Sequence, residues 1–207
     1  VHFRRAMAYA FDYDGFIRDI MKNSVVRNPG PNPNNIWGTP PGLAGYTFDL
    51  DKARAELKQV KLPLRTITIS ALAGFSESEQ SAVLFQNNLR QIGIDVKVET
   101  SPWSVISAAM RNEKTQADVV PLWKSTYYVD PNNWVGELTG SRYRGSRSMS
   151  WYSNPEVDAL LDRALVSNDH AERVTLYEKI TQIASDQAVS IFVYNTNWYG
   201  PYAKSVG

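Results

Sequence analysis

The sequence has no cysteine and only two histidines, His2 and His170. The missing cysteine excludes disulfides, thiolate metal sites and cysteine nucleophiles. Neither histidine has a partner at ligand spacing, so the sequence predicts no zinc site and no histidine-based triad. A glycine-rich phosphate loop is also missing, because the glycines of "GTPPGLAGY" lie among prolines with no P-loop lysine. We therefore expect no cofactor, no metal and little support for catalysis.

The sequence also has no marked excess of positive or negative charge and no long apolar run. The chain has 22 basic and 21 acidic residues, scattered along its length, so no basic stripe predicts nucleic-acid binding. No apolar run approaches the roughly 20 residues that span a bilayer, and we expect no membrane-spanning helix. The first residues, "VHFRRAMAYAFD", do not follow the order of a signal peptide. Either the protein is cytosolic or its signal lies outside this chain.

Aromatic residues are abundant. The 207 residues include 6 Trp and 11 Tyr, many of them in predicted loops, and this pattern is typical of a binding protein. The 43% hydrophobic content is sufficient for a substantial core. With no internal repeat and no long linker, the sequence favours one α/β domain.

The central third alternates between strand and helix patterns. Strands are predicted at "RTITISAL" (65–72), "IDVKVET" (94–100) and "ADVVPLW" (117–123). A helix from Ser76 to Gly93 has a capping box of Ser76 and Glu79, and its buried face is expected to comprise Ala82, Phe85, Leu89 and Ile92. A second helix begins near Pro102. This order predicts a mixed, mostly parallel sheet flanked by helices.

The flanking segments are mainly helical. Helices are expected within 3–21, after Asp49 or Asp51, at 154–165 with Asn154 as cap and Pro155 in first position, and at about 171–184. The stripe of the 154–165 helix comprises Val157, Leu160, Leu161, Ala164 and Leu165. Residues 28–46 form a long loop whose Trp37 is either a lid or simple packing. "AVSIFVYNT" (188–196) returns a strand to the sheet.

Several stretches, in order along the chain, resemble the extracellular solute-binding proteins of ABC importers, the peptide/nickel-binding family (family 5). They are "RRAMAYAFDYDGFI", "PGLAGYTFDLDKARAEL", "NNLRQIGIDVKVE", "LWKSTYYVDPNNW", "WYSNPEVDALLDRAL" and "AERVTLYEKITQIASDQAVSIFVYN". The resemblance covers essentially the whole chain. It implies a periplasmic binding protein type II fold, of which residues 1–207 are one α/β lobe.

In that family the ligand is enclosed between two lobes, and this chain resembles the second, C-terminal lobe. It begins where the family's chain crosses from the first lobe and ends near "YAKSVG", where it crosses back. The resemblance implies a periplasmic or cell-surface protein without catalytic activity, which captures a small solute and delivers it to ABC permease subunits. The missing first lobe would supply the other half of the pocket, and this chain alone should bind weakly.

The resemblance also bears on the ligand. Peptide-binding relatives carry, at the position of Thr126, an aspartate that pairs with the ligand's amino terminus. Dipeptide-binding relatives place an arginine after the strand matching "RTITISAL", where this chain has "AGFSESEQ". Both ends of the dipeptide clamp are missing, so we expect a sugar or opine-like solute and not an ordinary dipeptide. An oligopeptide remains the alternative.

The candidate ligand-binding residues are aromatic or hydroxylated. They are Trp103, Trp123, Ser125, Thr126, Tyr127 and Tyr128. We expect Trp103, Tyr127 and Tyr128 to be unusually exposed, whereas Trp123 and one tyrosine could instead belong to the core. Secondary candidates for an anionic group are Arg142, Arg144 and Arg147, for which a solvated loop is the simpler explanation.

The last secondary candidate, Asp130, precedes Pro131. An acidic cap followed by proline is a common helix start, so capping is favoured over ligand contact. If the protein were instead an α/β enzyme, Asp12, Asp14 and Asp130 would be its acid or base candidates, without a histidine partner. A structural module that has lost transport is the third alternative.

Overall fold

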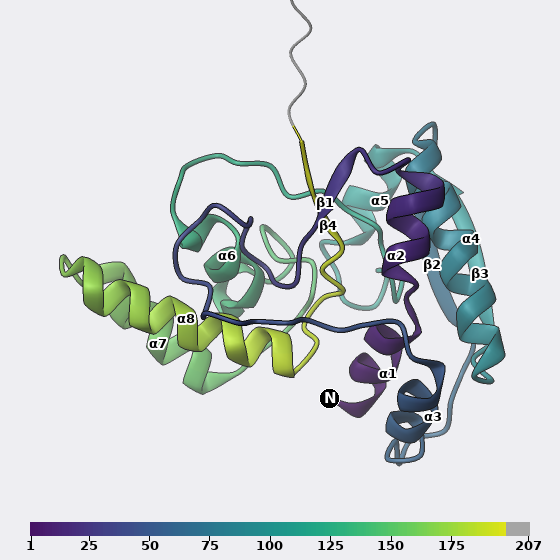
Figure 1. Cartoon of the computed structure of the whole chain (residues 1–207). Helices are drawn as coiled ribbons and strands as arrows, with labels where there is room; N and C mark the ends of the chain where they lie inside the picture. The colour runs from purple at the N-terminus through teal and green to yellow at the C-terminus, as the bar shows by residue number, and fades with distance from the viewer. Residues whose placement is uncertain (198–207) are drawn as a thin grey trace, which may run out of the picture.

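The computed structural model describes residues 1–197, and its helices form two groups on opposite sides of the molecule (Figure 1). The strands form two small sheets. The expected return of the chain to the first lobe at 202–207 lies outside the described residues. The α-helices are α1 (His2–Ala10), α2 (Tyr13–Gly15), α3 (Leu50–Leu57), α4 (Ser76–Gln91), α5 (Trp103–Ala109), α6 (Val135–Thr139), α7 (Pro155–Val166) and α8 (His170–Asp186). The strands are β1 (Val25–Arg27), β2 (Ile67–Leu72), β3 (Val96–Ser101) and β4 (Tyr194–Thr196). Shorter helical turns are η1 (Phe16–Ile20), η2 (Pro131–Asn133) and η3 (Ser141–Tyr143). The predicted mixed α/β fold is confirmed.

The parallel sheet is centred on β2. β2 pairs with β3 in register from Ile67 opposite Val96 to Leu72 opposite Ser101. Val119 forms a parallel bridge with Ile69, which places β2 between β3 and the stretch around Val119. The expected strand at 117–123 is therefore reduced to a single bridge. Pro121 has no N–H to donate, so the ladder cannot continue along this stretch.

The second sheet is antiparallel and pairs a strand near the start of the chain with the last described strand. β1 pairs with β4, with Val25 opposite Thr196 and Arg27 opposite Tyr194. The expected strand at 188–196 is thus confined to β4, and it pairs with β1 instead of joining β2 and β3.

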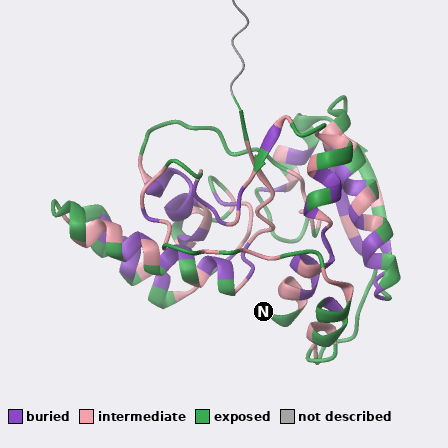
Figure 2. Cartoon of the chain, viewed as in Figure 1, coloured by how far each residue is buried: buried purple, intermediate pink, exposed green. Residues whose placement is uncertain are grey.

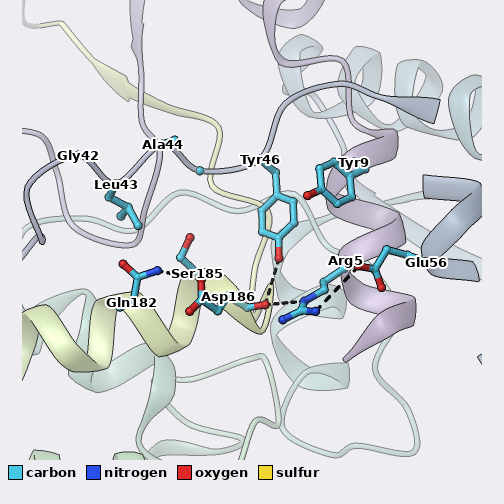
Figure 3. A pocket seen from close by; sticks show the side chains of 11 residues that line it. Arg5, Tyr9, Gly42, Leu43, Ala44, Tyr46, Glu56, Gln182, Ser185 and Asp186 are labelled. Carbon is cyan, nitrogen blue, oxygen red and sulfur yellow. Dashed lines mark hydrogen bonds and ion pairs between the residues drawn. The ribbon is translucent and has the colours of Figure 1, made fainter. Parts of the chain in front are cut away.

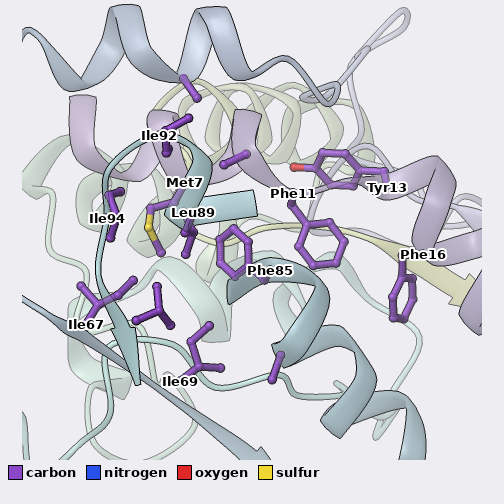
Figure 4. Close-up of a cluster of buried hydrophobic side chains, with 14 of the residues drawn as sticks. Met7, Phe11, Tyr13, Phe16, Ile67, Ile69, Phe85, Leu89, Ile92 and Ile94 are labelled. Carbon is purple, nitrogen blue, oxygen red and sulfur yellow. The ribbon is translucent and has the colours of Figure 1, made fainter. Parts of the chain in front are cut away.

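The larger core lies between α1, α4 and the parallel sheet (Figure 4). Ala82, Phe85, Leu89 and Ile92 are all buried, as the helical spacing predicts. The capping box is wrong, however: Phe75 is the N-cap, and no side chain caps the helix at that residue. Glu79 instead accepts from the Gly74 N–H, and the Ser76 hydroxyl accepts from Gln80.

The smaller core is formed by α6, α7 and α8, on the other side of the molecule (Figure 1). Asn154 caps α7 by accepting from the Glu156 N–H at 2.9 Å, and Pro155 follows it, as predicted. Val157, Leu160, Leu161 and Ala164 are buried, but Leu165 is exposed, so the apolar stripe is narrower than expected.

The loop at 28–46 packs on this smaller core. The Trp37 ring meets Tyr177 and His170 edge to face, with centroids 5.7 and 4.9 Å apart. Gly38 has φ +84°, and a Cβ there would come 2.8 Å from Cβ of Tyr177, so only glycine lets the loop approach α8 this closely. The contacts of Trp37 thus agree with the packing alternative.

None of the helices within residues 1–197 has the length and apolarity needed to cross a membrane.

Candidate functional site

Three aromatic side chains follow the carboxyl ends of the parallel strands. Phe75 comes shortly after β2 and Trp103 shortly after β3, while Trp123 follows the bridge at Val119. Because parallel strands end at one edge of a sheet, the three residues lie along the same edge. Phe75 and Trp123 contact each other with ring centroids 5.6 Å apart. Ligands of open α/β sheets bind at this edge.

The side chain of Trp123 is held by Tyr194, which is not among the predicted site residues. Its indole N–H donates to the hydroxyl of Tyr194 on β4. The Tyr194 ring stacks on Phe16 at 5.7 Å, and burial raises the pKa of its hydroxyl. Trp123 therefore has a partly exposed ring whose orientation is set from the protein side.

The expected exposure of the aromatic candidates is confirmed. Trp103 is 49% exposed, Tyr127 68% and Tyr128 40%. Trp123 is also exposed, and so does not belong to the core. Residues 122–129 form an exposed arc that joins the two halves of the molecule (Figure 2).

The exposed arc rests on a buried asparagine. The Asn133 side chain accepts from the Tyr127 N–H at 3.3 Å and donates to the Ser125 carbonyl at 3.1 Å. Asn132 similarly donates to the Tyr128 hydroxyl at 2.8 Å. Thr126 lies within this arc and is exposed.

Asp130 caps the next turn, as predicted. Its carboxylate accepts from the Asn132 N–H at 2.9 Å, although the turn is the 3-10 helix η2 and not the start of an α-helix. The second oxygen accepts from Arg173 of α8 at 2.8 Å. Arg173 in turn lies over the rings of Trp37 and Tyr177, at 5.1 and 5.7 Å. Both oxygens of Asp130 are thus occupied within the protein.

A second acidic residue, Glu137 of α6, lies below the arc. Its side chain is only 3% exposed and forms ion pairs with Lys124 and with Arg147. The Tyr128 hydroxyl donates to the same carboxylate at 3.3 Å. Burial raises the pKa of Tyr128, and the negative charge of Glu137 acts in the same direction.

The three candidate arginines do not converge. Arg142 pairs with Asp162, and Nε of Arg144 donates to the Ser141 carbonyl at 3.1 Å. Only Arg147 reaches the aromatic arc, where it lies 5.9 Å from the Tyr127 ring centroid. For Arg142 and Arg144, the structure therefore agrees with the simpler prediction that these residues lie in a solvated loop.

Of the three acid or base candidates of an enzyme, Asp12 and Asp130 accept hydrogen bonds within the protein, and Asp14 is exposed in the first turn of α2. Asp12 accepts from the Gly15 N–H at 2.9 Å. His2 lies 2.6 Å from Glu56, and His170 packs against Trp37. Within residues 1–197 no three His, Cys, Asp or Glu side chains are grouped in a way that could hold a metal ion.

A separate cavity of about 350 Å³ lies between α1, the loop at 42–46 and the end of α8 (Figure 3). The Asp186 carbonyl at its base accepts from Arg5 at 2.7 Å and from the Tyr46 hydroxyl at 3.1 Å. Its polar groups bind one another, and the cavity contains none of the predicted site residues.

Phe75, Lys124 and Glu137 belong to this site, although they were not among the site residues predicted from the sequence. Phe75 had a usable signal, because it follows a predicted parallel strand just as Trp103 does. Lys124 also lay inside the aromatic stretch. No signal in the sequence pointed to Glu137, because a glutamate after a helix start usually faces solvent. Only the tertiary structure shows that this side chain is buried.

Comparison with known proteins gives a consistent result. A probable D,D-dipeptide-binding periplasmic protein, DdpA, of Escherichia coli K12 is 28% identical over 207 residues, which are 98% of this chain and 39% of that protein. Among solved structures, the periplasmic binding protein DppA of Helicobacter pylori in complex with peptide STSA is 26% identical with a TM-score of 0.78, over 92% of this chain and 37% of that one. HbpA2 of Haemophilus parasuis shares the fold with a TM-score of 0.86 at 22% identity, over 94% of this chain and 39% of that one.

The chain therefore spans well under half the length of these relatives. DdpA and DppA are both named as binding proteins. Residues 1–146 match the family described as bacterial extracellular solute-binding proteins, family 5 Middle. The chain belongs to the bacterial extracellular solute-binding proteins of family 5.

Proposed function

We propose that this chain is the C-terminal lobe of a two-lobe receptor, which captures a small solute between its lobes and delivers it to an ABC permease. The observation that carries the proposal is the aromatic edge formed by Phe75, Trp103 and Trp123, continued by Tyr127 and Tyr128 on the arc. Monomeric proteins expose few such groups of aromatic side chains unless they bind something there. The first lobe would cover this edge on closure, as hinge-type receptors do. A periplasmic or cell-surface location follows from the same proposal.

The solute we propose is a sugar or an opine-like compound, and not an ordinary dipeptide. Thr126, the position of the ammonium-binding aspartate in peptide-binding relatives, offers no carboxylate. A ligand ammonium enclosed without a negative partner is strongly disfavoured. Exposed indole and phenol rings can instead stack on a sugar ring or cover an apolar ligand group.

An oligopeptide is the second candidate, and a specific observation favours it. Within the described part of the chain, the backbone N–H groups of residues 122–126 have no hydrogen-bond partner. An extended peptide could bind such a segment through its main chain, with specificity set by alternate side chains. Its amino terminus would then be bound elsewhere.

The proposal is tested by titrating this chain with maltotriose, octopine, alanyl-alanine and tetra-alanine while recording the indole N–H signals by NMR. We expect maltotriose or octopine to shift the signals of Trp103 and Trp123 but not that of buried Trp134. Affinity should be weak, because one lobe buries only part of the ligand. Trp123→Ala should abolish the shift, whereas Phe48→Ala, at an exposed aromatic of the linker before α3, should not.

A shift of both indoles by tetra-alanine alone would replace the sugar or opine proposal with the oligopeptide alternative. If no solute shifted Trp103 or Trp123, or if Phe48→Ala abolished binding as fully as Trp123→Ala, the aromatic edge would not be the binding surface.

A further inference from the structure

Two cations share one buried carboxylate beneath the exposed arc. Lys124 Nζ contacts one oxygen of Glu137, and Arg147 Nη1 donates to the other at 2.9 Å. The cationic side chains come from different segments, Lys124 from the arc and Arg147 from the loop before α7. Both also lie over the ring of Tyr127, at 5.2 and 5.9 Å from its centroid. The carboxylate and the ring therefore hold the two cations close together.

The cluster of Lys124, Arg147 and Glu137 has a net charge of one positive unit. Two cations meet a single carboxylate, and Glu137 has no further charge to offer. The Lys124 side chain is 34% exposed and that of Arg147 is 55% exposed, whereas Glu137 is almost fully buried. The negative partner is thus turned inward and the surplus positive charge faces outward.

Elsewhere below the arc, the charges balance. Asp130 and Arg173 form a one-to-one pair, and the two side chains are equally buried at 22% exposure. That pair joins η2 to α8 and leaves no charge for a ligand. A purely structural role for Glu137 would require only one cation in the same way.

We propose that Lys124 and Arg147 bind the carboxylate group of an organic acid, with Glu137 as the buried residue that positions both cations. This inference rests on the proposed function and narrows its substrate class to carboxylate-bearing solutes. Within the described residues, Nη2 and Nε of Arg147 have no hydrogen-bond partner. They are free to donate to a carboxylate, and the guanidinium geometry suits such an acceptor.

Preorganisation supports this assignment. A free lysine or arginine loses considerable rotamer entropy when it orders around a ligand. Here the Glu137 carboxylate and the Tyr127 ring already restrict both side chains. An incoming carboxylate would also add the negative charge that the cluster lacks, and its apolar part could contact exposed Tyr127 and Val129.

The test uses benzoate and its neutral counterpart benzamide. The two compounds have the same aromatic ring and nearly the same size, but only benzoate carries a carboxylate. This chain is titrated with each while the side-chain N–H signal of Arg147 and the ring signals of Tyr127 are recorded by NMR. We expect benzoate to shift both sets of signals to saturation, with benzamide at least about tenfold weaker because it offers no charge-assisted acceptor. Inorganic phosphate serves as the second anion.

The variants remove one cation each. Lys124→Gln and Arg147→Gln leave Glu137 paired one to one, and both should lose the preference for benzoate. Arg142→Gln is the matched control, since Arg142 also pairs with a carboxylate but lies away from the arc. Equal shifts from benzoate and benzamide, or equal loss in Arg142→Gln, would overturn the inference. Binding of phosphate without benzoate would overturn the assignment to carboxylates.

The outcome is separable from that of the proposed function. A chain that binds maltotriose at Trp123 but ignores benzoate would refute the carboxylate site and leave the receptor proposal intact. A chain that binds benzoate at Arg147 while no solute shifts Trp103 or Trp123 would support the anion site and refute the aromatic edge.

Discussion

Two adjacent stretches of this chain differ sharply in burial. Residues 122–129 are all exposed, including Trp123, Tyr127 and Tyr128, whereas residues 131–137 are all buried. The second stretch contains the groups that hold the first: Asn133 binds the backbone on both sides of Thr126, and Glu137 pairs with Lys124. Buried polar residues thus fix the backbone and several side chains of the exposed arc from below, while the aromatic rings of the arc stay exposed to solvent.

The largest effect should come from the buried stretch. Trp134 is 5% exposed, and Trp134→Ala should lower the free energy of unfolding by about 3–5 kcal/mol. Tyr127→Ala, seven residues earlier, should change it by no more than about 0.5 kcal/mol, because Tyr127 is mostly in water. Urea unfolding of both variants measures the contrast. Equal destabilisation would mean that the arc is part of the core, contrary to its exposure.

The next effect concerns Asp130, where the two stretches meet. Asp130→Ala removes both the cap of η2 and the partner of Arg173, and should cost about 1–2 kcal/mol. Asp130→Asn keeps a capping oxygen and removes only the charge, so its cost should be smaller. Thermal unfolding of the two variants at low and high salt separates the contributions, since salt screens only the ion pair. If Asp130→Asn cost as much as Asp130→Ala, the cap would contribute nothing.

Local signals in the sequence were sufficient for much of the fold. The Asn154-Pro155 helix start and the 3.6-residue spacing of Ala82, Phe85 and Leu89 depend on neighbours in sequence, and the structure confirms them. The strand at 117–123 failed for a local reason too, because Pro121 interrupts the ladder. The Ser76 capping box failed because Phe75 is the N-cap and Glu79 contacts Gly74 instead.

The site was harder to predict. The exposure of Tyr127 and Tyr128 followed from their place in a predicted loop, and that of Trp103 from its place at the start of a predicted helix. The burial of Glu137 did not, because it depends on Arg147 and Lys124 arriving from two other segments. The same holds for Arg142, Arg144 and Arg147, which look equivalent in sequence, although only Arg147 has a carboxylate beneath the arc.

The smallest expected effect is on the pKa of Tyr128, which links the exposed arc to the buried stretch. Its hydroxyl donates to buried Glu137 at 3.3 Å. Burial raises the pKa of Tyr128 above that of a free tyrosine, and the charge of Glu137 adds to this. Since the folded pKa is above the unfolded one, the associated stability is present below the unfolded pKa and is lost as pH rises through the folded pKa. An NMR titration of the tyrosine rings from neutral to alkaline pH should show Tyr128 ionising late. Glu137→Gln should move its pKa downward, because it removes the negative charge and leaves an amide in its place. An unchanged pKa in this variant would show that Glu137 has no electrostatic influence on the arc.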